Sequence, residues 1–210
     1  MRAKVALALS LALMIVVVAL TLTRSPLRVV RVGAKSKESL GTTTGSATVC
    51  QTGETLPASV SAIRLGMQAS FGPRVLLRAY SGSRILTAGS RAADWTGSSV
   101  TVPVEPLEHA ASPVKLCLYV PANSERLQLY GAHAVAAKAA VGREGQVFPG
   151  RVSVEYMEPG GGSWWSRALS VARHMGIGHA ISGTWVALLV AALVAALCAL
   201  VIRLGWRELP

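Results

Sequence analysis

Hydrophobic residues fill both ends of this chain and alternate with polar residues between them. Residues 5–22 and 184–202 contain no charged side chain. Uncharged apolar stretches of about 18 residues or more are long enough to cross the roughly 30 Å hydrocarbon core of a bilayer as helices. The pattern therefore predicts a transmembrane helix near each end, with a domain of short strands between them.

The first apolar run begins like a secretory signal. Arg2 and Lys4 precede it, but the run is longer than the roughly 7 to 15 apolar residues of a cleaved signal peptide. The pattern favours an uncleaved signal anchor, and a cleaved signal peptide is the alternative. Either one exports the middle of the chain.

The second run is flanked by tryptophans. Trp185 and Trp206 lie 21 residues apart, which at a rise of about 1.5 Å per residue separates them by roughly 31 Å. Tryptophan favours both head-group boundaries of a membrane, because its ring is apolar and its N–H is polar. We expect two membrane passes, with both tails in the cytoplasm and the middle outside.

One observation opposes this orientation. Five cations between residues 24 and 37 closely follow the first run, and positive charge beside a membrane segment favours the cytoplasmic side. The secretory start and a pair of cysteines, described below, favour an exported middle domain.

The middle of the chain reads as a series of β-strands. From Val114 to Val120, every second residue is apolar, so that Val114, Leu116 and Leu118 share one face of a strand. About eight short runs bounded by Pro and Gly follow one another here, a spacing typical of an antiparallel sandwich. Residues 132–140 are rich in alanine and fit either a strand or a helix. We expect a mainly β fold, an antiparallel β-sandwich.

These patterns divide the chain into six expected parts. They are a signal anchor or transmembrane helix at 1–23, a polar tether at 24–45, an extracytoplasmic β-sandwich at 46–158, a linker with an interfacial amphipathic segment at 159–183, a transmembrane helix at 184–203 and a cytoplasmic tail at 204–210.

Three neighbouring segments carry a resemblance to a known class of domains. They are Arg84-Ile85-Leu86-Thr87-Ala88-Gly89, Asp94-Trp95-Thr96-Gly97 and Val100-Thr101-Val102-Pro103, in the order hairpin, loop with a tryptophan, strand. This order resembles the jelly-roll modules of galactose-binding-like, carbohydrate-binding domains. The resemblance implies a jelly-roll-like sandwich that binds sugars.

The C-terminal part carries a second resemblance. From Ser163-Trp164-Trp165-Ser166 through the last apolar run, it is similar to the tails of uncharacterised envelope membrane proteins of high-GC bacteria. Such proteins are linked to surface-glycan assembly, which implies an accessory role in that process. The composition agrees with a high-GC genome, because Arg outnumbers Lys by 16 to 5.

Cys50 and Cys117 are the cysteines outside the apolar runs, and both fall in predicted strands. An exported domain oxidises such a pair readily, so we expect a disulfide, with two buried thiols as the alternative. Cys198 lies within the second apolar run and is expected to behave as a small hydrophobic residue.

The sequence offers little for catalysis. Asp94 is the single aspartate, and the four histidines show no metal-ligand spacing. No nucleophile elbow, phosphate-binding loop or dinucleotide fingerprint is present. We expect no enzymatic activity, no catalytic residue, no cofactor and no metal.

The net charge of +11 is spread along the chain rather than gathered in one patch. Cations beside membrane segments favour anionic lipid head groups, so we expect a lipid bilayer, and not nucleic acid, as the partner.

Two segments are candidates for binding. In the first, Arg91, Asp94 and Trp95 lie in one loop, where the tryptophan ring would stack on a sugar and the charged groups bond its hydroxyls. The alternative is a tryptophan that caps the core. In the second, Trp164 and Trp165 open an amphipathic segment that we expect at the membrane interface, with a plain linker as the alternative.

The function that we expect is binding or scaffolding without catalysis. We expect a two-pass protein of the bacterial cytoplasmic membrane, with another integral membrane protein and a glycan as candidate partners. The alternative is a carbohydrate-binding module displayed at the membrane surface.

Overall fold

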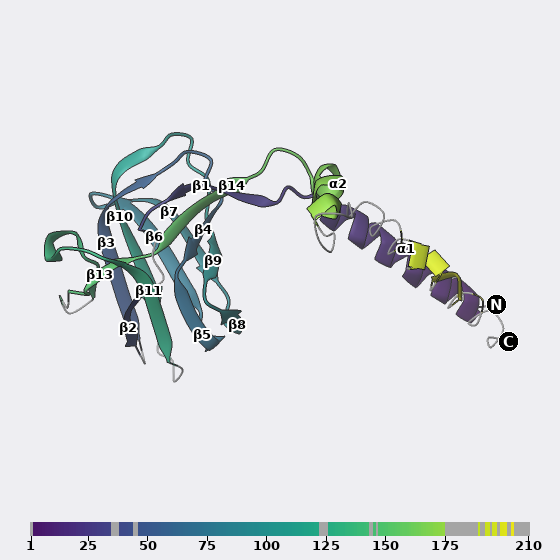
Figure 1. The fold of residues 1–210 in the computed structure, drawn as a ribbon, viewed down its shortest axis with the longest axis horizontal. Coiled ribbons are helices and arrows are strands. Elements are labelled where there is room, and N and C mark those ends of the chain that lie inside the picture. Colours follow the sequence, from purple (N-terminus) through teal and green to yellow (C-terminus); the bar gives the residue numbers. More distant parts are fainter. Residues whose placement is uncertain are drawn as a thin grey trace. The chain divides into compact units, whose positions relative to one another are not determined.

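The computed structural model describes residues 2–34, 38–43, 46–121, 126–142, 145, 147–174, 189, 192–193, 195–196, 198–200 and 203. It forms two compact units, which are described separately. One is Leu27–Pro159, and the other consists of Met1–Pro26 and Gly160–Pro210. Figure 1 traces the elements of both units.

One layer of the Leu27–Pro159 unit, the first layer, is a five-stranded antiparallel sheet. Its order is β12 (Val141–Gly142), β3 (Ala47–Leu56), β10 (Ala111–Val120), β6 (Val75–Ser81) and β7 (Arg84–Arg91). The hairpin of β6 and β7 turns at Gly82, whose φ of 58° lies in the left-handed region that favours glycine.

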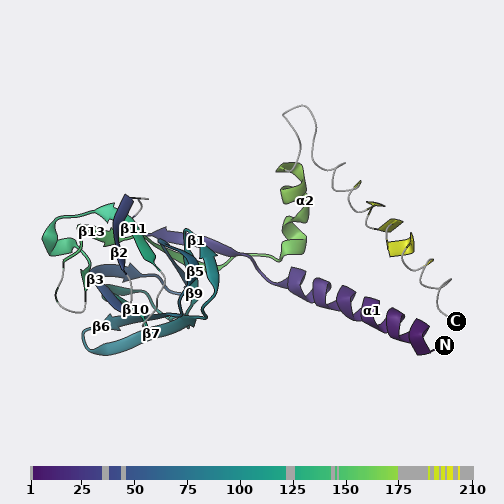
Figure 2. The ribbon, with the colours of Figure 1, turned by 90° about the horizontal axis from the view of Figure 1, so that it is seen from below.

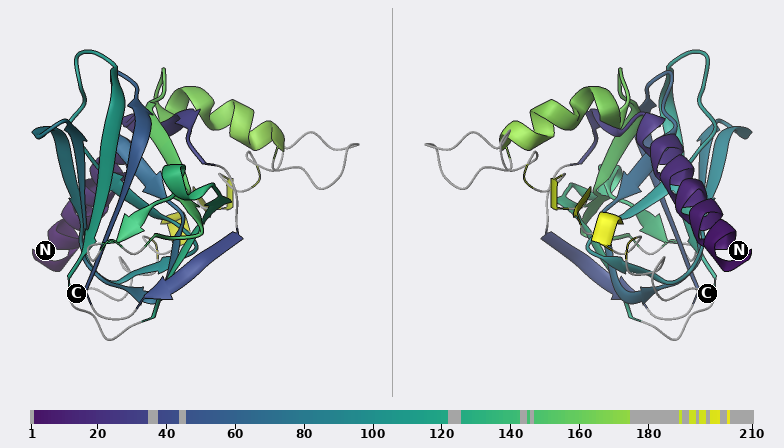
Figure 3. Two further views of the ribbon diagram at one scale, coloured as in Figure 1. Left: turned by 90° about the vertical axis from the view of Figure 1, so that its left-hand side faces the viewer. Right: turned by 90° about the vertical axis from the view of Figure 1, so that its right-hand side faces the viewer.

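The opposite layer, the second layer, contains two antiparallel sheets. One has the order β1 (Leu27–Val32), β14 (Val154–Pro159), β4 (Ala62–Leu65) and β9 (Val100–Pro103). The other has the order β13 (Gly150–Val152), β11 (Leu127–His133), β5 (Met67–Gly72) and β8 (Trp95–Gly97), with β2 (Glu38–Thr43) also paired to β11. Figure 2 shows β3, β10, β6 and β7 on one side and β1, β11, β5 and β9 on the other, and Figure 3 gives two end views.

The core lies between these layers, and the alternation along β10 is confirmed. Val114, Leu116, Leu118 and Val120 are each at most 5% exposed. They face apolar residues of the second layer, as expected when two inner sheet faces pack together. A small internal space is bordered by side chains of both layers, namely Val49, Gln51, Leu65, Leu77, Leu116, Leu118, Val152 and Val154.

Two predicted runs differ in detail from the observed elements. One of the eight short runs, residues 59–69, contains two strands, β4 and β5, because Gly66 between them ends one sheet and begins another. The alanine-rich stretch at 132–140 is neither a long strand nor a helix. It contains the end of β11 and a short 3-10 turn, η1 (Ala136–Lys138).

The polar tether expected at 24–45 is wrong, because this stretch contains β1 and β2. Leu40, on β2, is 4% exposed and belongs to the core. One apolar residue at the right position is enough to place a polar strand on a sheet that the rest of the chain has built. The sandwich thus spans Leu27–Pro159 rather than residues 46–158.

The chain enters and leaves the sandwich on neighbouring strands. β1 pairs with β14 in an antiparallel register that sets Leu27 opposite Pro159 and Arg28 opposite Glu158. The Arg28 Nε donates a 2.8 Å hydrogen bond to the Glu158 carboxylate. Both chain ends therefore leave this unit side by side.

The predicted disulfide between Cys50 and Cys117 is confirmed. The two residues are opposite each other on β3 and β10, with Cα atoms 4.1 Å apart. The bond closes a sequence separation of 67 residues, which contributes about 4 kcal/mol of stability in the chain-entropy model.

A buried carboxylate joins the two layers. Glu54, on β3, is 5% exposed. The Tyr156 hydroxyl donates to its Oε2 at 2.9 Å, the Gln51 Nε2 donates to its Oε1 at 2.9 Å, and the Arg151 guanidinium forms an ion pair with Oε1. Gln51 also bonds the backbone of Val152, donating to its carbonyl at 3.3 Å and accepting from its N–H at 2.9 Å. These partners belong to β13 and β14 of the second layer and to β3 of the first.

The partners of Glu54 are themselves hydrogen-bonded or protonated. Arg151 also donates to the carbonyl oxygens of Lys138 and Thr52, both at 2.8 Å. Burial raises the pKa of Tyr156 far above its usual value, and the neighbouring Glu54 charge raises this pKa further. The phenol therefore stays protonated and remains a donor. A buried carboxylate is tolerated when its charge is paired and its oxygens are hydrogen-bonded in this way.

The other unit contains two helices, α1 (Arg2–Thr23) and α2 (Trp164–His174). α2 follows Ser163, whose hydroxyl accepts a hydrogen bond from the Ser166 N–H at 3.4 Å, as an N-cap residue does. Trp164 and Trp165 are 45% and 54% exposed. The predicted amphipathic segment is therefore a helix over 164–174, and its location at a membrane interface stays a prediction.

α1 coincides with the predicted N-terminal segment. Its apolar side chains between Val5 and Leu20 include many that are about half exposed. Among the described residues, no helix combines the length and the apolar character needed to cross a membrane. Trp185, Trp206 and most of the predicted helix at 184–203 lie outside the described residues.

We predict that Glu54→Ala lowers the free energy of unfolding by about 3 kcal/mol, because it leaves the Arg151 charge and two buried donors without their acceptor. Tyr156→Phe removes one neutral donor and is expected to lower it by about 1 kcal/mol. Chemical denaturation of the full chain measures both. Glu108→Ala, which removes an exposed carboxylate, is the control, and an equal loss there would contradict the prediction.

Candidate functional site

The structure brings the three predicted ligand-binding residues together. Arg91 ends β7, Asp94 lies in the following loop and Trp95 begins β8. All three line one surface hollow of about 380 Å³. Asp94 has a φ of 68°, in the left-handed region, and its N–H donates to the Gly72 carbonyl at 2.8 Å. Its exposed carboxylate thus stands at the rim.

For Trp95, the structure agrees with the alternative, a tryptophan that caps the core. Trp95 is 6% exposed and belongs to the core. Its Nε1 donates to the Pro73 carbonyl at 2.8 Å. The ring lies so close to Gly72 that a Cβ at that position would fall 2.0 Å from Cε2. A ring enclosed in this way caps the core and offers no free face to a sugar.

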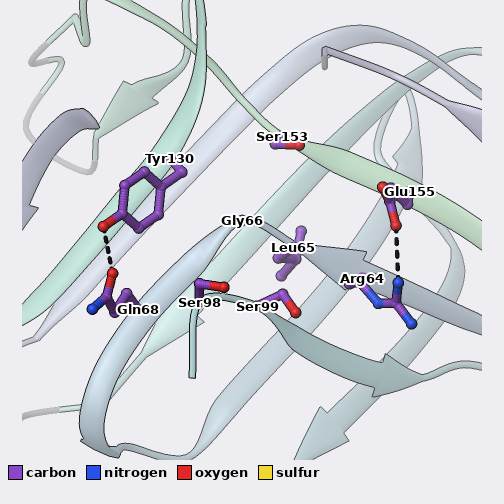
Figure 4. A pocket seen from close by; sticks show the side chains of 9 residues that line it. All are labelled: Arg64, Leu65, Gly66, Gln68, Ser98, Ser99, Tyr130, Ser153 and Glu155. Carbon is purple, nitrogen blue, oxygen red and sulfur yellow. Dashed lines mark hydrogen bonds and ion pairs between the residues drawn. The ribbon is translucent and has the colours of Figure 1, made fainter. Parts of the chain in front are cut away.

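A larger hollow lies on the outer surface of the second layer. It has a volume of about 530 Å³. Figure 4 shows its lining residues, which are Arg64, Leu65, Gly66, Gln68, Ser98, Ser99, Tyr130, Ser153 and Glu155.

The base of this hollow is a junction of three chain segments. Gly66 donates its N–H to Ser153 O at 2.9 Å, Ser153 donates to Tyr130 O at 2.8 Å, and Tyr130 donates to Gly66 O at 2.9 Å. A Cβ on Gly66 would lie 3.0 Å from both the Ser153 Cβ and the Tyr130 carbonyl oxygen. Glycine therefore allows the three backbones to approach, and it leaves open space above them.

The side chains around this junction are fixed in pairs. Arg64 forms an ion pair with Glu155, with Nη1 and Oε2 3.2 Å apart, and its Nε donates to Thr101 Oγ1 at 3.4 Å. The Tyr130 hydroxyl donates to Oε1 of the Gln68 side chain. Both pairs join neighbouring strands of the second layer (Figure 4). The hollow therefore presents hydrogen-bonding groups whose positions are already set.

Three serine hydroxyls complete the polar lining: those of Ser98, Ser99 and Ser153. Ser99 also lines the hollow at Arg91 and Asp94, so the two hollows meet there. The lining of the larger hollow has no histidine or cysteine that would activate a serine. Among the described residues, no group of three His, Cys, Asp or Glu side chains is arranged to hold a metal ion.

Sequence reasoning missed this hollow. Three of its lining residues occupy outward positions on different strands: Arg64, Tyr130 and Glu155. The sequence alone does not show which outward residues become neighbours in the folded sheet. The signal that was present is Gly66, a glycine within the apolar alternation at 62–69. A glycine inside a strand pattern indicates a bulge or a close backbone approach.

We predict that Trp95→Ala lowers the free energy of unfolding by about 3 to 5 kcal/mol, because it leaves a cavity and an unpaired Pro73 carbonyl. Phe71→Ala is the matched control, since Phe71 is a 65% exposed aromatic residue on the neighbouring strand β5. Thermal unfolding of the full chain compares the two variants. Equal stability of Trp95→Ala and the unchanged protein would show that the ring is not part of the core.

The chain matches no protein-family model, no curated protein and no solved structure. Its resemblance to galactose-binding-like domains stays a prediction from the three segments between Arg84 and Pro103.

Proposed function

We propose that this chain is a membrane-anchored binding protein of the bacterial cell envelope. In this proposal its sandwich binds a hydroxyl-rich glycan in the hollow of the second layer and serves as an accessory to surface-glycan assembly, without catalysis. The observation that carries the proposal is the set of pre-positioned polar side chains above the Gly66 junction.

The chemistry of the lining supports a glycan. Sugar hydroxyls both donate and accept hydrogen bonds, so they need donors and acceptors at close spacing. Arg64 and the serine hydroxyls donate, while Glu155 and Oε1 of the Gln68 side chain accept. The charges of Arg64 and Glu155 offset each other, which favours a neutral ligand over an ionic one.

The rigidity of the lining also supports binding. Its side chains project from paired strands and are held by contacts among themselves, so that little side-chain freedom remains to be lost when a ligand binds. The one carboxylate of the lining, Glu155, is already paired with Arg64, which argues against its activating a serine for catalysis.

The anchoring part of the proposal rests on the apolar segments at 5–22 and 184–202. It is supported by the exposed apolar side chains of α1 and by the exposed Trp164 and Trp165 of α2. β1 and β14 bring the first and last residues of the sandwich to neighbouring positions. This is required if both ends are attached to the same membrane. The disulfide is typical of an oxidising compartment.

A scaffold for another integral membrane protein is the second candidate function. The exposed aromatic residues of α2 favour it, because exposed tryptophans are common anchors of protein interfaces. A test of glycan binding, described next, separates the two functions, because a scaffold that acts through α2 does not require the hollow.

We predict that Gln68→Ala weakens glycan binding by about tenfold, because one good hydrogen bond to a ligand corresponds to about 1 kcal/mol or more. A glycan array probed with the full chain in detergent identifies the ligand, and calorimetry then compares variants. Tyr130→Phe, which keeps the ring and removes the hydroxyl, is expected to act in the same direction.

The chain offers a matched control for this experiment. Gln128 lies directly opposite Gln68 in the β11–β5 register but does not line the hollow. Gln128→Ala is therefore expected to bind glycan as the unchanged protein does. Equal loss in both variants, or no binding to any glycan, would exclude the hollow as the site.

The proposed location is tested by labelling. We expect a cysteine placed at the exposed Ser90 of β7, in a Cys198→Ala background, to react with a membrane-impermeant thiol reagent on intact cells. The chain without the added cysteine is the control for background labelling. Reaction that occurs only after lysis would place the sandwich in the cytoplasm.

A further inference from the structure

The outward face of the first layer carries a cluster of cations and tyrosines. Lys115 of β10 is directly opposite Tyr80 of β6, and two residues further along β10 and β6 are Cys117 and Arg78. Tyr119 follows on β10. Arg78 and Lys115 are exposed, and the two tyrosines are half-buried. We call Arg78, Tyr80, Lys115 and Tyr119 the tyrosine–cation cluster.

Contacts within this cluster hold its members in place. The hydroxyls of Tyr80 and Tyr119 are 3.0 Å apart and form a hydrogen bond. The Arg78 guanidinium carbon lies 5.5 Å from the centre of the Tyr119 ring, within range of a cation–π interaction. The positive charge of Arg78 is therefore held over the ring of Tyr119, one of the two hydrogen-bonded tyrosines.

The polarity of these contacts leaves the cluster with donors. The hydrogen bond with Tyr119 lowers the pKa of Tyr80, and Arg78 and the Lys115 charge lower it further. The same hydrogen bond raises the pKa of Tyr119. Either hydroxyl can donate in the bond between them, so the pair keeps one O–H hydrogen that can be donated to a ligand. Chains of hydroxyls bonded in this way strengthen the outermost donor.

On the strands of the first layer, no acidic residue balances these charges on the same face. Within strands β12, β3, β10, β6 and β7, all of whose residues are described, the one acidic residue is Glu54. Glu54 faces inward to Arg151 and Tyr156. The β7 residues that pair with Arg78 and Tyr80 are Ala88 and Ile85, which carry no charge. The first layer therefore presents donors and positive charge together.

We propose that the tyrosine–cation cluster binds a phosphate group, through an O–H of the Tyr80–Tyr119 pair, the Arg78 guanidinium and the Lys115 ammonium. A phosphate offers more acceptor oxygens than a carboxylate, and it matches three donors from three side chains. This site lies on the opposite layer from the glycan hollow, and its test does not depend on that hollow.

The test uses the full chain in zwitterionic detergent and a synthetic poly(glycerol phosphate) of defined length, with binding measured by calorimetry. Arg78→Gln and Tyr80→Phe are each expected to weaken binding by about tenfold, the loss of one charge-assisted contact. Tyr80→Phe is the sharper variant, because it removes a donor and leaves the net charge and the ring unchanged.

Arg126→Gln is the matched control for charge. Arg126 is exposed and lies just before β11, in the other layer. The protein carries a net charge of +11, so a loose attraction of any polyanion would respond equally to either arginine. We expect Arg126→Gln to reduce affinity by less than about twofold, as for a screened surface charge.

Three results would overturn the proposal. They are unchanged binding by Tyr80→Phe, equal losses in Arg78→Gln and Arg126→Gln, and no binding of the polymer by the unchanged protein. Uncharged dextran of similar length should not compete. Lys115→Gln, at an exposed position, provides a second variant if Arg78→Gln loses its fold in a thermal unfolding assay.

Discussion

The carboxylate of Glu54 is the contact on which the arrangement of the two layers depends. An apolar core attracts without direction, so it brings two sheets together without deciding which residues face each other. Glu54 adds direction, because its two oxygens accept from Tyr156, Gln51 and Arg151 on three different strands. Any slip between β3 and the segment formed by β13 and β14 leaves a buried charge without its partners, which is more costly than a loss of apolar contact.

The candidate site on the outer surface follows from this interior contact. Arg151 and Val152 are held by Glu54 and Gln51, and the next residue, Ser153, enters the backbone junction with Gly66 and Tyr130. From Ser153 the chain continues into β14, which carries Tyr156 inward and Glu155 outward. The position of the hollow is therefore set by the same segment that fixes the layers, and a ligand there meets side chains whose backbone cannot shift freely.

Local patterns along the sequence predicted local features of the fold and missed the features that depend on several segments. The alternation at 114–120 gave β10 correctly, because a strand in a sandwich has one wet and one dry face. Two cysteines outside the apolar runs permit one pairing. The Cys50–Cys117 disulfide was therefore predicted once the middle of the chain was expected to be exported. β2 was missed because Leu40 is one apolar residue among polar ones. The hollow was missed because it needs residues near 64, 130 and 155 to meet, and their pairing is set by the topology of the sheets.

The two outer faces of the sandwich differ in how their charges are balanced, and this difference argues for two kinds of ligand. On the outer face of the second layer, Arg28 and Arg64 each have a carboxylate partner. These pairs offer direction while their charges offset each other, which suits neutral hydroxyl groups. In the first layer, Arg78 lies over a tyrosine ring and Lys115 beside a tyrosine hydroxyl, with no acid on that face of the strands. Water and salt screen such charges at little cost, so a face with unbalanced charges is stable by itself. The gain in binding free energy is greatest for an anion that brings several acceptors at once. A sandwich held rigid from within can keep these two faces apart, so that a neutral and an anionic ligand need not compete.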